Sequence, residues 1–466
     1  MQKKEKETYM KPFIQYLVEQ NINKVRIVIL TSRKKNGNSE DLYRTAKSIK
    51  KLCEKKGIDC YNVFAEDAYI RRESGRLYIH NINDSKGFEI SSADTVVIVR
   101  GSVGRLQSSL DLLSQMERNG IYCVNYRNTL ESCSDKYRTA LLLADNDIST
   151  PKTAIVTSEK GLEIAFKKMG GKFPVVLKTL TGSKGIGVFI SDSWESMRST
   201  LQTIWKINKD VEIVMQEYLD ADYDMRVHVL GEKVIAAMKR YKIEKDFRSN
   251  YSLGGKVEKF DPTEEEKEIA ILAAKAVGAA WAGVDLMRNK KDNKLYVIEV
   301  NSSPGTEGIE KATGEPVVEK VIDFVLDKNN WKRPATEAGF IETVKIQGIG
   351  EISAKLDTGN GSYCVLHADE IDIRGDKVVW KHDGKTFTND IETVKKFVIG
   401  GVRNEKETRP VIFLNVEFNG DTYEMRFALS DRNGMTTPCL LNRKFIRQAN
   451  LIINPAKQYV LTIKKD

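Results

Sequence analysis

The chain lacks any long hydrophobic run. None of its apolar stretches reaches the roughly 18 residues needed to cross a bilayer, and the segment Met1 to Met10 is too polar for the core of a signal peptide. We therefore expect a cytoplasmic protein with no membrane partner. Cysteine is also scarce. The six cysteines are scattered without close pairs, which is typical of a reduced compartment.

A strong charge of one sign is missing as well. Lys and Arg number 74 against 65 Asp and Glu, and no basic stripe interleaved with aromatic residues is present, so we expect no nucleic-acid partner. The net charge of +9 suits anionic ligands such as nucleotides or acidic peptides. With 41% hydrophobic and 30% charged residues in 466, the chain is globular and too long for one core, so two to four domains are expected.

The stretch from Val175 to Val188 carries the most informative pattern. An apolar strand bearing Lys178 breaks into a glycine-rich loop and then resumes as a strand, whereas a Walker loop opens a helix. Glycine lets backbone N–H groups approach phosphate oxygens, and lysines supply charge. We predict a hairpin that covers phosphates; a flexible surface hairpin is the alternative. The loop residues concerned are Gly182, Ser183, Lys184, Gly185 and Gly187.

The region before this loop alternates strands and helices from residue 24 to about 125, which predicts a small α/β layer with a mostly parallel sheet. The segment Arg100 to Ser102 ends one of these strands, where open α/β sheets bind ligands, although a solvated turn is equally compatible. Lys136 stands in the first turn of a helix and opposes its dipole. An anion nearby would explain this lysine; simple solvation is the alternative.

Polar residues recur on the strands that follow. The strand from Glu212 to Leu219 ends in residues that can offer backbone groups to an adenine and a carboxylate to a ribose; an edge strand is the simpler interpretation. These residues are Gln216, Glu217 and Tyr218. Asp224, Arg226 and His228 alternate and therefore share one strand face, where His228 alone is better explained as a hydrogen-bonded sheet residue than as a catalyst.

Further cations and carboxylates follow. Arg240 ends the next strand, and Arg248 and Asn250 lie in the loop beyond it, each with a solvated alternative. Two later strands form a predicted hairpin that places Asp285, Glu299 and Asn301 on one face. Buried carboxylates need a counter-charge, and hard oxygen ligands suit Mg²⁺ completed by phosphate oxygens and water. These three residues are the candidate magnesium ligands, with Mn²⁺ as an alternative metal.

Together these stretches resemble the ATP-grasp superfamily and, within it, the RimK-type α-L-glutamate ligases, over about residues 24 to 325. The resemblance implies that ATP phosphates bind the loop, Lys136 and Lys178, that Glu217 contacts the ribose, and that Asp285, Glu299 and Asn301 hold magnesium. It places phosphate and the reacting carboxylate near Arg226, Arg240, Arg248 and Asn250. Lys239 replaces a glutamate of the family and Tyr241 a second arginine, which leaves the added amino acid open.

The chemistry that this implies is carboxylate activation. A carboxylate does not react with an amine in neutral water until its oxygen becomes a leaving group, and phosphorylation by ATP achieves this. The acyl phosphate is then attacked by an amine to give an amide. We expect an ATP- and Mg²⁺-dependent ligase that adds an amino acid, with glutamate expected, to a peptide or protein C-terminus. A small-molecule peptide or polyglutamate synthetase is the alternative.

After a polar linker the composition changes to short strands and glycine turns, as in an all-β barrel. Asp357-Thr358-Gly359 looks like the active-site loop of a pepsin-type aspartic protease. The wider pattern is similar to a retropepsin-like family that accompanies RimK-type ligases and has been labelled both aspartic and zinc protease. Asn360 stands where that family usually has alanine.

Aspartic proteolysis needs two carboxylates that share a proton, and one Asp-Thr-Gly triplet supplies only one. A homodimer would bring two copies of Asp357 together; otherwise the domain trims nothing and binds a partner. A barrel in which Asp357 merely caps a turn is a third option. A zinc site would draw on Cys364, His367 and Cys439, which lack a compact ligand pattern.

The predicted organisation is an α/β pre-ATP-grasp and ATP-grasp part followed by an acid-protease-like barrel. Its boundaries are an N-terminal tail (1–23), a pre-ATP-grasp domain (24–125), an ATP-grasp domain (126–328), a linker (329–338) and a retropepsin-like domain (339–466).

Overall fold

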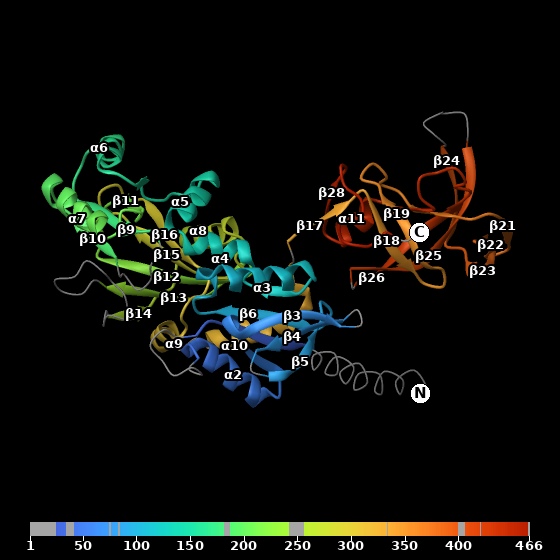
Figure 1. The fold of residues 1–466 in the computed structure, drawn as a ribbon, viewed down its shortest axis with the longest axis horizontal. Helices are drawn as coiled ribbons and strands as arrows, with labels where there is room; N and C mark the ends of the chain where they lie inside the picture. The colour runs from blue at the N-terminus through green and yellow to red at the C-terminus, as the bar shows by residue number, and fades with distance from the viewer. Residues whose placement is uncertain are drawn as a thin grey trace, which may run out of the picture. The chain divides into compact units, whose positions relative to one another are not determined.

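The computed structural model describes residues 25–33, 42–73, 76–82, 84–180, 187–241, 256–332, 334–398, 406–419 and 421–464 (Figure 1). They form two compact units, one comprising most residues up to Trp331 and the other comprising mainly Lys332–Asp466. Among the described helices, none is long and apolar enough to cross a membrane.

The first unit begins with the predicted parallel sheet, in the order β2-β1-β6-β7. Its strands are β1 (Arg26–Thr31), β2 (Cys60–Phe64), β6 (Thr95–Arg100) and β7 (Tyr122–Val124), accompanied by α2 (Arg44–Lys56) and α3 (Gln107–Arg118). Every residue of β6 is buried, as expected for a parallel sheet covered on both faces. Helix α2 ends at Gly57, whose φ of 66° is readily adopted by glycine.

The segment around residues 76–82 does not join that parallel sheet. It belongs to a separate antiparallel sheet of β3 (Ala68–Glu73), β4 (Arg76–Asn81) and β5 (Asp84–Ile90). Short 3₁₀ helices at Ala65–Asp67 and Val103–Arg105 connect strands. Two helices follow, α4 (Arg127–Ser134) and α5 (Lys136–Asp145), and Asp135 caps α5 by accepting the N–H groups of Tyr137 and Arg138.

The predicted strand–loop–strand is confirmed, because β9 and β10 pair antiparallel with Lys178 opposite Val188. They belong to a sheet in the order β10-β9-β11-β8. Its elements are β8 (Thr153–Val156), α6 (Glu159–Lys168), β9 (Val175–Thr179), β10 (Val188–Ser191), α7 (Trp194–Ile207) and β11 (Ile213–Glu217). Gly187 has φ 76°, and a Cβ there would lie 2.6 Å from Thr179 Oγ1, so this position requires glycine.

A five-stranded antiparallel sheet in the order β14-β13-β12-β15-β16 completes the first unit. Its strands are β12 (Tyr223–Leu230), β13 (Lys233–Tyr241), β14 (Val257–Lys259), β15 (Trp281–Arg288) and β16 (Leu295–Asn301), and its helices are α8 (Glu264–Ala276), α9 (Glu307–Thr313) and α10 (Val317–Leu326), with a 3₁₀ turn at Lys328–Asn330. One face packs apolar residues such as Val227 and Val284 against alanines of α8. The opposite face carries the polar residues described below.

The second unit is mostly β, as predicted. Strands β18, β19, β27, β20, β26 and β25 follow one another around a ring that β25 closes by pairing with β18. The elements are β17 (Thr336–Gly339), β18 (Ile341–Ile346), β19 (Gly350–Leu356), β20 (Cys364–His367), β21 (Ile371–Arg374), β22 (Lys377–His382), β23 (Lys385–Asp390), β24 (Thr393–Val398), β25 (Lys406–Phe418), β26 (Asp421–Ser430), β27 (Cys439–Leu441), α11 (Arg443–Gln448) and β28 (Leu451–Asn454).

Candidate active site

The strand register brings the predicted site residues onto one face of the five-stranded sheet. Arg226 on β12 lies opposite Asp285 on β15, and Asp285 lies opposite Glu299 on β16. Asp224 on β12 lies opposite Arg240 on β13. Because side chains of directly opposed residues point to the same side, the sequence pattern and the register together define a polar face.

Two arginines enclose the carboxylate of Asp285. Arg226 donates from Nε to Asp285 Oδ1 (2.7 Å) and from Nη2 to Oδ2 (2.6 Å). Arg240 Nη2 lies 2.9 Å from Asp285 Oδ2, and Arg240 Nε donates to Asp224. The side chains of Arg240 and Asp285 are only 4% and 8% exposed. Burial alone would raise the pKa of Asp285, but the two guanidinium groups outweigh it and hold this pKa at about 2.

The candidate metal ligands fit magnesium only in part. Within the described chain the half-buried Glu299 carboxylate has no hydrogen bond or ion pair. Asn301 donates from Nδ2 to Gly283 O (3.2 Å), which leaves its carbonyl oxygen for a ligand. Asp285 is already held by arginines, so the counter-charge that its burial demands is supplied without a metal. Glu299 and Asn301 suit a Mg²⁺ ion whose coordination is completed by phosphate oxygens. The described residues include no group of three His, Cys, Asp or Glu that could hold a metal without such a ligand.

Two lysines lie near Glu299. Lys136, the first residue of α5, donates from Nζ to the carbonyls of Thr179 (3.3 Å) and Leu180 (3.4 Å). Lys178 donates to the side-chain oxygen of Gln216. Desolvation lowers the pKa of Lys178 to about 8 and also lowers the pKa of Lys136, while the charge of Glu299 opposes both shifts. The predicted phosphate-binding lysines and the predicted metal ligand therefore share one electrostatic environment.

The predicted nucleotide end of the site lies on β11. Gln216 also donates from Nε2 to Thr153 Oγ1 (3.0 Å), which fixes its amide. The Glu217 carboxylate accepts the backbone N–H of Lys152 (3.3 Å), and Tyr218 follows the strand. The predicted loop residues Gly182, Ser183, Lys184 and Gly185, and the predicted catalytic Arg248 and Asn250, lie outside the described residues.

Two buried side chains differ from their sequence interpretation. Arg100 neither forms a solvated turn nor faces an open site, because it is 3% exposed, stacks on Trp281 (4.4 Å) and donates to the carbonyl of Pro304. His228 is fully buried, and neither ring nitrogen has a hydrogen-bond partner among the described residues, so the expectation of a hydrogen-bonded histidine was wrong. Burial lowers the pKa of His228 to about 3, which keeps it neutral.

The departures from the family pattern lie on the opposite face of the sheet. Lys239 is adjacent to Arg240 and therefore points away from the polar face, where its Nζ lies over the rings of Tyr223 (4.3 Å) and Phe260 (4.8 Å). Tyr241 donates to Glu258. These substitutions therefore do not alter the polar face directly.

In the second unit Asp357 follows β19 in a tight loop. Its Oδ1 accepts the N–H of Gly359 (2.9 Å), and its own N–H donates to Leu441 O (2.9 Å). Arg443 of α11 supports the loop by donating to the carbonyls of Thr358 (3.1 Å) and Gly359 (3.2 Å). The Asp-Thr-Gly loop is thus held by hydrogen bonds on both sides.

The zinc alternative finds no support in the described residues. Burial raises the pKa of the Cys364 thiol to about 12 and that of Cys439 well above its usual range. His367 accepts the N–H of Arg432 at Nδ1 (3.0 Å) and contacts Asp369 at Nε2 (3.0 Å), so both ring nitrogens are engaged. No metal-binding cluster includes these residues.

Comparison with known proteins supports both resemblances. A family model of the RimK-like ATP-grasp domain matches residues 133–325, and one described as retropepsin-like aspartic endopeptidase RimB matches residues 338–464. A protein named "Probable alpha-L-glutamate ligase" from Pseudoalteromonas translucida (strain TAC 125) is 35% identical over 315 residues, which are 67% of this chain and 99% of that protein. The chain belongs to the RimK-type α-L-glutamate ligase family. The resemblance stated from sequence, including the fused retropepsin-like domain, is confirmed.

Solved structures confirm the ATP-grasp fold of this RimK-type chain. A RiPP-associated ATP-grasp ligase from Chryseobacterium gregarium aligns with a TM-score of 0.51 at 12% identity, over 66% of this chain and 99% of that one. The ATP-grasp ligase PsnB aligns with a TM-score of 0.50 at 18% identity, over 65% and 98%. At these identities the likeness concerns the fold alone.

The buried ion network predicts a stability effect. Replacing Arg240 with Met leaves Asp224 and Asp285 short of a buried partner, and we expect unfolding free energy to fall by about 3–5 kcal/mol. Urea unfolding followed by tryptophan fluorescence, in a Trp380→Phe background, reports the first unit only. Arg198→Met, which removes an exposed ion pair, is the control and is expected to change stability by less than about 1 kcal/mol. Equal effects of the two substitutions would contradict the network's importance.

The pKa of Lys178 predicts a pH dependence of nucleotide binding. A lysine that contacts phosphate binds it in the protonated form, so affinity for ADP should be constant below pH 8 and fall as pH rises through about 8. Calorimetry should show that the affinity for ADP is up to about tenfold lower at pH 9 than at pH 7. This is the change expected when the pH lies one unit above the pKa of the lysine. Lys178→Met should bind weakly and without this slope, whereas surface Lys167→Met should keep it; a slope that persists in Lys178→Met would exclude the role.

Proposed function

We propose that the first unit phosphorylates a carboxylate with ATP and joins it to the amino group of glutamate, extending the C-terminus of a peptide or protein. The observation that carries this proposal is the polar face of the five-stranded sheet, where Glu299 adjoins the Arg226–Asp285–Arg240 network. Lys178 of β9, on the four-stranded sheet, interacts electrostatically with Glu299 and Asp285. Relatives named α-L-glutamate ligase support glutamate as the added amino acid. Fold neighbours solved with a precursor peptide, or with leader and core peptides, support a peptide acceptor.

Each charged residue of the site has a role in binding ATP or the reacting carboxylate. Lys136 and Lys178 hold the phosphates of ATP, with the loop from Gly182 to Gly187 covering them. Glu217 contacts the ribose. Arg226 and Arg240 offer N–H groups to the transferred phosphoryl and the reacting carboxylate, which stabilises the charge that develops on oxygen.

Magnesium, when bound to Glu299 and Asn301 with Asp285 beside them, would neutralise charge on the phosphate oxygens. Arg226 and Arg240 would keep hold of the Asp285 carboxylate, so that two guanidinium groups stand beside the site where the phosphoryl group and the carboxylate would meet.

The ligase proposal is tested with Glu299→Gln. Because the substitution removes the free carboxylate, we expect glutamate-dependent ADP release to fall by about 100-fold or more while the melting temperature stays near that of the unaltered protein. Glu163→Gln, which alters an exposed ion pair on α6, is the control. Undiminished ADP release in Glu299→Gln would refute the metal assignment. Product masses separate a peptide acceptor from the small-molecule alternative, in which only a dipeptide or polyglutamate grows.

The second unit has a second candidate function, peptide cleavage by an aspartic dyad. Two observations support it: Arg443 holds the Asp-Thr-Gly loop by hydrogen bonds, and the matching family model is described as an aspartic endopeptidase. Since the sequence has one such triplet, the dyad needs a homodimer that contributes two copies of Asp357. The competing proposal is a barrel that only binds the protein partner.

Asp357→Asn separates these two proposals. If the barrel cleaves, the substitution should abolish release of glutamate from a glutamate-extended peptide, as measured by mass spectrometry, and leave ligation intact. Asp369→Asn, on the neighbouring β20–β21 turn, serves as the control. Absence of any cleavage by the unaltered protein, at concentrations where it is dimeric by light scattering, would favour the binding module.

A further inference from the structure

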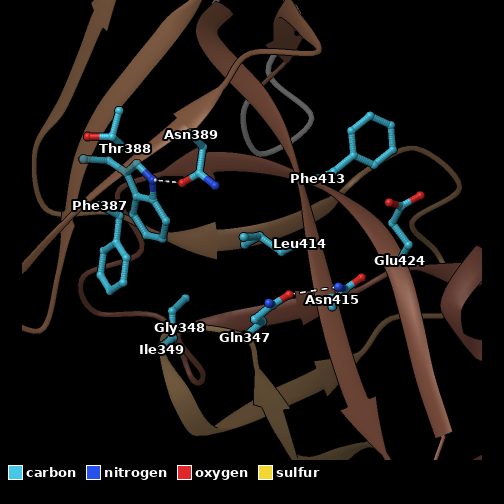
Figure 2. A pocket seen from close by; sticks show the side chains of 11 residues that line it. Gln347, Gly348, Ile349, Phe387, Thr388, Asn389, Phe413, Leu414, Asn415 and Glu424 are labelled. Atoms are coloured by element: carbon cyan, nitrogen blue, oxygen red, sulfur yellow. Dashed lines mark hydrogen bonds between the residues drawn. The ribbon is translucent and has the colours of Figure 1, made fainter.

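The second unit carries a pocket of about 360 Å³ (Figure 2). The turn between β18 and β19 lines it, together with parts of β22, β23, β25 and β26. Asp357 follows the opposite end of β19, and a strand of 7 residues spans roughly 20 Å. The pocket is therefore separate from the Asp-Thr-Gly loop.

Among the described residues, one edge of β25 has no strand partner beside this pocket. Along this edge, Glu392 N donates to Val411 O (2.8 Å) and Gln347 N donates to Asn415 O (3.0 Å). Backbone groups of alternate residues point to the same edge, so the N–H and C=O of Phe413 point there too. No strand in the described part of the chain pairs with Phe413 on this side, since the pairing with β24 stops at Thr393 opposite Val411 and the pairing with β18 starts at Ile346 opposite Val416. Between these two contacts, the edge therefore offers the backbone N–H of Phe413 as a donor and its C=O as an acceptor, with no strand partner for either among the described residues.

The lining combines aromatic rings, amides and a single carboxylate. In Figure 2 the side chains of β23 lie on one side of the pocket, and those of Phe413 and Glu424 lie on the other. Asn415 donates to the side-chain oxygen of Gln347 (2.8 Å) near Leu414. Glu424 is the only ionisable lining residue and has no ion pair among the described residues. The guanidinium of Arg426 lies over the Phe413 ring (5.5 Å) and is paired with Glu392 (2.9 Å). The Glu424 carboxylate is therefore the charge left for a ligand, and it favours a basic residue.

We propose that this pocket binds an extended peptide segment of a partner protein, which pairs with the backbone of Phe413. From Val411 to Asn415 the free edge measures about 13 Å, enough for roughly three extended residues. Side chains of the segment alternate between the apolar Leu414 side and the Glu424 side, so an apolar residue flanked by Lys or Arg fits. Glu424 disfavours acidic segments. The occupant is thus not a polyglutamate tail, and the inference stands independently of the ligase proposal.

The test uses the full-length protein labelled with ¹⁵N-phenylalanine, in which Phe413→Leu identifies the Phe413 amide signal. The probe is the capped heptapeptide Ala-Ala-Lys-Phe-Lys-Ala-Ala, titrated into the millimolar range that weak single-segment contacts require. We expect a saturable shift of the Phe413 signal. The same peptide N-methylated at its central phenylalanine and the two lysine positions loses the donors that pair with the strand, so it should cause no saturable shift.

Charge reversal tests the specificity. Ala-Ala-Glu-Phe-Glu-Ala-Ala should bind at least about tenfold more weakly than the lysine peptide, and Glu424→Lys should reverse this order, because opposite charges attract across a strand pair. Glu424 is exposed, so this variant should fold, and its melting temperature verifies that. Equal binding of the N-methylated peptide would overturn strand pairing. No shift with any peptide, or an order that Glu424→Lys leaves unchanged, would overturn the site.

Discussion

The buried contact of Asp285 with Arg226 and Arg240 is the constraint on which the first unit depends. A carboxylate that is only 8% exposed is costly unless it is paired, and here both oxygens of Asp285 accept hydrogen bonds, from Arg226 on β12 and Arg240 on β13. The same contact fixes where the arginines stand relative to Glu299. One set of residues thus meets a structural requirement of the sheet and, in the proposed function, the electrostatic requirement of carboxylate activation.

The parallel sheet at the start of the first unit supports this arrangement from outside the site. Asn125 follows β7 and donates to the carbonyls of Trp281 (2.7 Å) and Ser302 (2.7 Å), and its side-chain oxygen accepts the N–H of Ala280 (2.7 Å). It therefore ties the beginning of β15 to the residue that follows Asn301. The metal candidates on β16 are positioned by an asparagine that follows a strand of a different sheet.

Sequence reasoning found the layers, the strand–loop–strand and the shared face of Asp224 and Arg226, because these follow from local alternation and glycine placement. It assigned the counter-charge of Asp285 to a metal, since arginines on other strands cannot be assigned to a carboxylate without the register. It also missed the burial of Arg100 and the lack of any hydrogen-bond partner for the His228 ring among the described residues. Both depend on packing between sheets that are distant in sequence, which no local pattern encodes.

The central claim is that ATP activates a carboxylate by phosphorylating it, and the fate of a carboxylate oxygen tests this most directly. A peptide mixture labelled with ¹⁸O at its C-terminal carboxyl groups is incubated with the protein, ATP, magnesium and glutamate, and the phosphate and the extended peptides are analysed by mass spectrometry. The account predicts one ¹⁸O in the phosphate released by the first glutamate addition to each peptide. Extension accompanied by unlabelled phosphate, or by ¹⁸O in AMP, would contradict it.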